Sequence, residues 1–141
     1  MKLTLTFLLF CGAAQAQTIS PVIAECGLKC RGEFTVTNNA VKPITAVITP
    51  YSFKVVDQKV QLLDLDKSTK VELDATSARI SPQASRTFYY KLSCDKEPCM
   101  TQLVAGFLAG KTAGGIEVWL KIPHVVYSCQ KQKDCRKKAL H

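Results

Sequence analysis

Six of the seven cysteines form the clearest chemical pattern in this chain, because they lie in three pairs that are close in sequence. Three, four and five residues separate the members of the successive pairs, and each intervening segment has the composition of a turn. Six cysteines allow many disulfide connectivities, and sequence alone does not choose among them. We favour the three local disulfides, which join Cys26 to Cys30, Cys94 to Cys99 and Cys129 to Cys135.

A zinc site is the alternative use of these cysteines, since spacings of three and four residues are close to those of zinc-binding thiolates. His124 and His141 are the histidines that would complete such a site. Residues 1–16 have the pattern of a cleaved leader, and its removal takes away Cys11 and leaves an even number of cysteines in an oxidising compartment, which favours disulfides over zinc. The sequence also has no Cys-x-x-Cys redox pair. We therefore expect disulfides, with no metal and no cofactor.

Catalytic side chains are scarce in the rest of the chain. His124 follows Pro123 in an apolar stretch, which favours a hydrogen-bonded or exposed histidine over a general base. Asp64 and Asp66 are two residues apart and would share one face of a strand, where a solvated pair is more common than a cation site. The sequence contains no Gly-x-Ser-x-Gly motif, metal-binding histidine pair or phosphate-binding loop. We predict that the protein is not an enzyme.

Residues 1–16 have the features of a secretory signal peptide. Lys2 supplies a positive charge, an apolar run extends from Leu3 to Cys11, and Ala14-Gln15-Ala16 matches the small-x-small cleavage pattern. The run is too short for a membrane span, which needs about 20 apolar residues. A buried N-terminal strand is the alternative, while the bulky Phe10 disfavours lipoprotein processing at Cys11. We expect a periplasmic or secreted protein with no transmembrane segment in its mature chain.

The remaining elements must position these residues, and the composition indicates a single globular domain of 141 residues, 47% of them hydrophobic. Residues 86–92 place Phe88, Tyr90 and Leu92 on one face, and residues 103–109 are apolar on both faces, as in a central strand. Further strands are predicted at residues 33–37, 44–49, 52–56, 60–65, 70–73 and 116–122. About seven short strands separated by turns predict an antiparallel β-sandwich.

The order of these segments resembles the N-terminal immunoglobulin-like domain of PapD-like periplasmic pilus-assembly chaperones. Phe34 to Asn38 matches an early strand of the form apolar-x-apolar-x-Asn, and Ile44 to Pro50 matches an apolar strand that ends near a proline. Ile80 to Arg86 is similar to the turn before the next long strand, and residues 116–122 match the last alternating strand. The resemblance covers residues 19–128 and implies an immunoglobulin-like sandwich.

The resemblance also implies a way of binding. These chaperones hold the C-terminal carboxylate of a partner with an arginine and a lysine in their cleft. Residues 19–25, the strand where the arginine would lie, contain none, and either Lys121 or His124 would stand at the lysine position. The chaperones have a second immunoglobulin-like domain, which we do not expect in a chain of this length.

Residues 116–122 are the candidate partner-binding strand. An exposed edge strand with alternating apolar residues can pair with a strand of another chain through main-chain hydrogen bonds. A strand that faces the protein's own core needs the same alternation, so both interpretations stay open. The predicted binding residues are Ile116, Val118, Leu120 and Ile122 on one face and Lys121 on the other.

Positive charge is concentrated at the C-terminus. The chain has a net charge of +8, and residues 129–141 hold five basic residues against one acidic residue. Such a tail can dock on an anionic lipid, a cell-wall polymer or an acidic protein, or it can aid solubility. Export makes nucleic acid an unexpected partner.

These observations divide the chain into a signal peptide at residues 1–16, an immunoglobulin-like domain at residues 17–128 and a basic tail at residues 129–141. We expect a non-catalytic exported module that binds an envelope or secreted protein, with edge-strand pairing as its chaperone-like mode. The alternative is a structural or surface module that its basic tail docks to an anionic envelope component.

Overall fold

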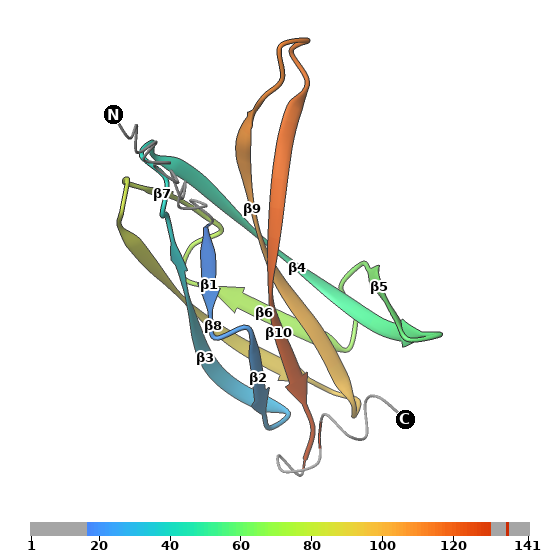
Figure 1. Cartoon of the computed structure of the whole chain (residues 1–141). Helices are drawn as coiled ribbons and strands as arrows, with labels where there is room; N and C mark the ends of the chain where they lie inside the picture. Colours follow the sequence, from blue (N-terminus) through green and yellow to red (C-terminus); the bar gives the residue numbers. More distant parts are fainter. Residues whose placement is uncertain (1–16, 131–134, 136–141) are drawn as a thin grey trace, which may run out of the picture.

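The computed structural model of the protein describes residues 17–130 and Cys135, and it consists of ten β-strands in two facing sheets (Figure 1). This architecture confirms the predicted β-sandwich. The predicted signal peptide at residues 1–16 and most of the predicted basic tail lie outside the described residues. Among the residues that are described, no helix is long and apolar enough to cross a membrane.

The first sheet has the strand order β1–β3–β8–β6, and the second has the order β2–β10–β9–β4–β5, with β7 paired to β4. All strand pairs are antiparallel except β10 with β2, which is parallel. The strands of the first sheet are β1 (Thr18–Ser20), β3 (Lys29–Thr37), β8 (Ser85–Cys94) and β6 (Thr69–Leu73). Those of the second are β2 (Ile23–Cys26), β10 (Glu117–Ser128), β9 (Cys99–Lys111), β4 (Ile44–Val56), β5 (Lys59–Leu63) and β7 (Ser77–Ile80).

The hydrophobic core lies between the sheets and follows the alternation of their strands. Phe88, Tyr90 and Leu92 of β8 are buried, as predicted, and Phe34 of β3 stacks on Phe88 with 5.4 Å between the ring centroids. The central position of β9 between β10 and β4 is also confirmed, although the apolar segment continues beyond the buried part of the strand. Its buried residues include Leu103, Val104, Ala105 and Phe107, whereas Leu108 and Ala109 are exposed.

Pro50 does not end a strand, so the prediction of separate strands at residues 44–49 and 52–56 is wrong. The two segments form one strand, β4, which pairs with β9 across Pro50. The Ile48 N–H donates to the Thr76 carbonyl on the side of β4 away from β9, and alternation points the Pro50 nitrogen to that same side. On that side, the pairing of β4 with β7 ends at Val47, and its pairing with β5 starts only at Ser52. The proline therefore removes no hydrogen bond from the sheet.

Residues 19–25 do not form one strand either. The chain divides at Pro21 into β1, which pairs with β3 in the first sheet, and β2, which pairs with β10 in the second. β3 begins at Lys29 rather than Glu33, because its pairing with β8 extends to Ser93, and within this extension Gly32 gives room to the buried Tyr90 side chain. A Cβ atom on Gly32 would overlap the Tyr90 hydroxyl.

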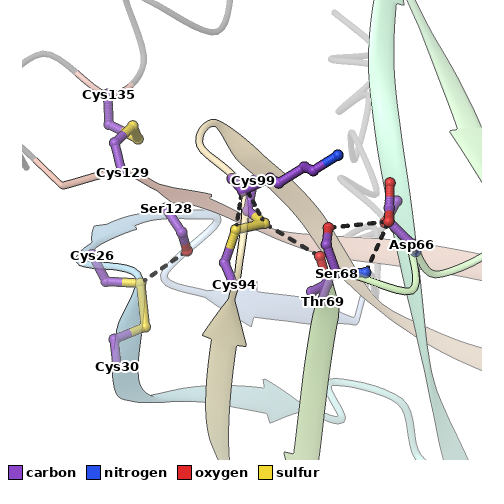
Figure 2. Close-up of a disulfide and its surroundings, with 12 residues drawn as sticks. Cys26, Cys30, Asp66, Ser68, Thr69, Cys94, Cys99, Ser128, Cys129 and Cys135 are labelled. Carbon is purple, nitrogen blue, oxygen red and sulfur yellow. Dashed lines mark hydrogen bonds between the residues drawn. A yellow bond between two sulfur atoms is a disulfide. The ribbon is translucent and has the colours of Figure 1, made fainter.

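Three disulfides close one end of the sandwich, and they are the three predicted local pairs: Cys26–Cys30, Cys94–Cys99 and Cys129–Cys135 (Figure 2). Backbone hydrogen bonds from Cys94 to Leu28 and from Cys129 to Cys26 connect the three loops. Cys129 and Cys135 are buried in a second apolar cluster. The predicted tail therefore starts with a segment that is anchored to the sandwich. Disulfide-bonded sulfurs are not thiolate ligands, so these pairs overturn the zinc alternative.

Candidate functional site

The upper half of β10 is a free edge of the second sheet. β9 pairs with β10 over its whole length from Glu117 to Ser128. On the other side, β2 pairs with residues 125–128 only. Within the described part of the chain, no strand pairs with the outer edge of residues 117–122. Figure 1 shows this half of the β9–β10 hairpin extending beyond the other strands of the sandwich. A free edge of this kind presents backbone groups that another chain can pair with.

The backbone polar groups on this edge can be assigned from the alternation of the strand. The Val125 N–H donates to the Val22 carbonyl at 2.7 Å, so it points toward the outer edge. Every second residue of a strand directs its backbone N–H and C=O to the same side. The backbone groups of Pro123, Lys121 and Trp119 therefore also point toward the outer edge. Pro123 offers a carbonyl only. Trp119 and Lys121 therefore supply both a donor and an acceptor to an incoming strand.

Most of the predicted binding side chains are exposed rather than part of the core. Ile116 lies in the turn before β10 and is 67% exposed, while Val118 and Leu120 on β10 are 42% and 45% exposed. Ile122 is different, because it is half-buried and packs against the core. Lys121 is exposed on the edge. The alternative that all four apolar residues face the protein's own core therefore holds for Ile122 alone.

A β-bulge separates the hairpin tip from the rest of β9 and β10. Val118 pairs with Gly110 and Trp119 with Leu108, so Ala109 is the extra residue on β9. At the tip, backbone hydrogen bonds join Thr112 to Ile116 and Gly115 to Thr112, and Gly115 adopts a φ of 81° that favours glycine. The tip is therefore a defined turn.

Trp119 and Lys121 also line a shallow groove on the outer face of the second sheet. The groove has a volume of about 220 Å³, and Gly106 of β9 lies in its floor between Val47 and Lys121. The Trp119 indole N–H donates to Glu117 Oε2 at 3.3 Å, and Glu117 Oε1 pairs with Lys111 Nζ at 3.6 Å. These contacts orient an exposed tryptophan next to the free edge. Trp119 is not among the binding residues predicted from the sequence.

His124, at the start of the lower half of β10, packs against the core and is hydrogen-bonded on both ring nitrogens. It is fully buried and stacks on Phe34, with 5.0 Å between the ring centroids. Its Nδ1 lies 2.7 Å from the Pro21 carbonyl, which only accepts, so Nδ1 carries the proton. Its Nε2 then accepts from the Tyr90 hydroxyl at 2.9 Å. The predicted hydrogen-bonded histidine is therefore confirmed, and it connects β10 with β8 and with the segment between β1 and β2.

Burial shifts the pKa of both groups in this network. Desolvation lowers the pKa of His124, and the hydrogen bond to the Pro21 carbonyl opposes this shift. Desolvation raises the pKa of Tyr90 to about 12. Both groups are therefore neutral at physiological pH. A buried, neutral histidine with both nitrogens occupied is neither a general base nor a cationic partner for a carboxylate, which leaves Lys121 as the candidate for that position.

The two aspartates considered as a cation site are not on a strand, because β5 ends at Leu63. Asp66 instead caps a turn, where its Oδ1 accepts hydrogen bonds from the backbone N–H and the hydroxyl of Ser68. The backbone hydrogen bond from Ser68 is the largest cause of the lowered pKa of Asp66, followed by the bond from the Ser68 hydroxyl. The premise that the two carboxylates share a strand face was wrong.

Comparison of the structure with solved structures finds proteins of similar fold, whereas comparison of the sequence finds none. No family model and no curated protein matches this chain. SSP-19, an MSP-domain protein like family member of Caenorhabditis elegans, matches with 10% identity and a TM-score of 0.55, over 79% of this chain and 98% of that chain. A chain of the CsuC-CsuE chaperone-tip adhesion subunit pre-assembly complex of Acinetobacter baumannii matches with 11% identity and a TM-score of 0.57, over 86% of this chain and 64% of that one. The E. coli chaperone DraB matches with 10% identity and a TM-score of 0.57, over 80% and 54%.

This protein therefore has an immunoglobulin-like sandwich of the PapD-like kind, which confirms the fold implied by the sequence resemblance. Identities near 10% show the fold alone. The chain spans 64% of the matched chain in the pre-assembly complex and 54% of DraB. Their binding activities are therefore not transferred to it by similarity.

Proposed function

We propose that this protein is a non-catalytic binding module that captures an extended segment of an envelope or secreted protein as an added strand on the free edge of β10. The uncovered edge of residues 117–122 is the observation that carries this proposal. Main-chain hydrogen bonds would give affinity, and the exposed Val118 and Leu120 would contact alternate side chains of the partner. Ile116 at the tip and Ile122 at the base of the edge mark the limits of this surface.

Lys121 is the residue we assign to electrostatic recognition of the partner. It is exposed on the free edge, whereas His124 is buried and neutral. An ammonium group beside an open strand edge would favour an acidic residue or a terminal carboxylate at the matching end of the added segment.

The fold supports a protein partner, because chains of the same architecture include chaperones, one of them in a complex with a tip adhesion subunit. The three disulfides fit an oxidising compartment. The predicted signal peptide and these disulfides support a periplasmic or secreted location. The absence of enzyme chemistry stays a prediction, which the use of His124 as a structural side chain supports.

The test removes one backbone donor from the free edge of β10. Lys121→Pro removes the N–H that faces the free edge, whereas Lys121→Ala removes only the side chain and is the matched control. Partners captured from an envelope extract by the mature chain would be identified, and their affinity for the two variants measured. We expect the proline variant to bind at least about ten-fold more weakly than the alanine variant. Hydrogen exchange of the complex would show new protection at Trp119 and Lys121.

The opposite pattern would favour the alternative function. A captured partner that binds both variants equally, gives no protection on β10 and dissociates in high salt or on removal of the basic residues after Gln130 would identify a module docked by its tail. Thermal unfolding of the variants checks that any loss of binding is not a loss of folding.

A further inference from the structure

We propose that the outer face of the first sheet binds the phosphate groups of an anionic lipid surface. The site is a cluster of four exposed cations around a serine, which we call the basic face. It is lined by Lys29 and Arg31 of β3, Lys70 of β6, and Lys91 and Ser93 of β8. These residues surround a shallow hollow of about 360 Å³ in which Glu72 is the one acidic lining residue. This surface is distinct from the free edge of β10, which belongs to the other sheet.

The strand register forces these like charges together. Ser93 pairs with Lys29 on one side and with Lys70 on the other, so a hydroxyl lies between two ammonium groups. In the next row, Lys91 lies directly opposite Arg31 on one side and Glu72 on the other. Like charges directly opposite each other destabilise an antiparallel pair. An anion bound over Ser93 would neutralise them and accept a hydrogen bond from its hydroxyl.

The rest of the same sheet face shows the ordinary arrangement. Higher on β3 and β8, the hydroxyls of Thr35 and Thr87 bond to each other at 2.8 Å, and so do those of Thr37 and Ser85. By contrast, no ion pair joins a cation of the basic face to an acidic residue in the described part of the chain. The excess charge is therefore local to the lower half of the face.

The basic face also accounts for the net charge of the sandwich. Residues 17–128 contain thirteen basic and ten acidic residues, a net charge of +3. The four cations and Glu72 of the basic face contribute all of this +3. The other charges of the sandwich cancel in number, with nine of each sign.

The geometry favours a lipid surface over a single acidic segment. The cations are spread over three adjacent strands and two cross-strand rows on an open face, which suits a planar array of headgroups. β8, at the centre of the basic face, is paired with β3 on one side and with β6 on the other, so no extended peptide can add a strand between the cations. The Cys129 N–H also donates to the carbonyl of Cys26, which is disulfide-bonded to Cys30 between Lys29 and Arg31. Cys129 is therefore connected to the loop that leads into β3.

The test is flotation of the mature chain with vesicles of phosphatidylglycerol and phosphatidylcholine, with pure phosphatidylcholine as the reference. The variant Lys29→Gln/Lys70→Gln/Lys91→Gln neutralises the basic face. The matched control Lys42→Gln/Lys54→Gln/Lys59→Gln removes the same charge from exposed lysines elsewhere. Each lysine near an anionic surface contributes about five-fold to binding, so we expect the first variant to lose about 100-fold in partition coefficient. The control should lose less than about ten-fold, and both should unfold at the temperature of the wild type.

Three results would overturn the proposal. Equal losses in the two triple variants would show that net charge alone drives binding. Full loss on replacing the five basic residues after Gln130 by glutamine, with no effect of the basic-face variant, would assign binding to the tail. Equal binding to pure phosphatidylcholine vesicles would exclude recognition of the anionic headgroup. A retained interaction with the protein partner in the basic-face variant would separate this site from the free edge of β10.

Discussion

The two halves of β10 show how one strand can serve both stability and binding. The lower half lies between β9 and β2, and His124, Val126 and Ser128 are fully buried there. The upper half has β9 as its one strand neighbour in the described structure, and Val118, Trp119 and Leu120 are exposed. The exposed upper half has the regular apolar alternation, whereas the buried lower half includes His124 and Ser128, so burial follows what covers each half and not the apolar pattern. The lower half supports the sandwich, while the upper half keeps its edge and side chains available.

The largest effect should come from shortening a buried side chain in the lower half. Val126→Ala removes two methyl groups from a site with no exposed surface and leaves a cavity, so we expect a loss of about 2 to 3 kcal/mol in the free energy of unfolding. Urea unfolding of the mature chain measures it. A loss below about 1 kcal/mol would mean that the lower half is not part of the cooperative core.

A smaller effect is expected at the junction between the halves. Tyr90→Phe leaves the buried Nε2 of His124 without its hydrogen-bond donor, which should cost about 1 to 2 kcal/mol of unfolding free energy. Hydrogen exchange should show faster opening of β10 around His124 than in wild type. Unchanged stability would indicate that water replaces the tyrosine hydroxyl.

The same junction should make stability depend on pH. The folded-state pKa of His124 lies below the ordinary value of 6.5, so below that value the unfolded chain binds more protons than the folded one. Its contribution to stability is therefore complete above pH 6.5 and is lost as the pH falls, by at most about 1.4 kcal/mol per pH unit. Unfolding midpoints between pH 7 and 5 test this, with His124→Gln as the variant that should remove this part of the slope. An identical slope in that variant would assign the effect to other groups.

The smallest effect should come from the upper half. Leu120→Ala removes a side chain that is 45% exposed, so the unfolding free energy should fall by less than about 1 kcal/mol. Partner binding should weaken more than stability does, because Leu120 would contact the added strand. A stability loss as large as that of Val126→Ala would show that the upper half belongs to the core, and it would contradict the proposed binding surface.

Local features of the fold could be predicted from the sequence, whereas whether a proline interrupts a strand could not. The three disulfides were predictable because each closes a short turn, and the buried face of β8 followed from strict alternation. Pro50 misled the prediction because its effect depends on which side of β4 lacks a partner. Pro21 separates two strands that pair with different sheets, which also depends on partners far away in sequence.

The candidate site shows the same limit. Alternation identified Ile116, Val118, Leu120 and Ile122 as a set, but it could not say where along the strand the opposing sheet stops. The basic face was equally hidden, since Lys29 and Arg31 meet Lys70 and Lys91 only through the register of β3, β8 and β6.

The sequence by itself determined the strand composition and the local disulfides of this protein, because these depend on neighbouring residues. Export stays a prediction from the leader pattern. Tertiary structure alone decided which residues are covered, which edge is free and which charges lie together. These properties arise from pairing between distant strands, and a period of two residues specifies the face of a side chain without specifying what lies opposite it.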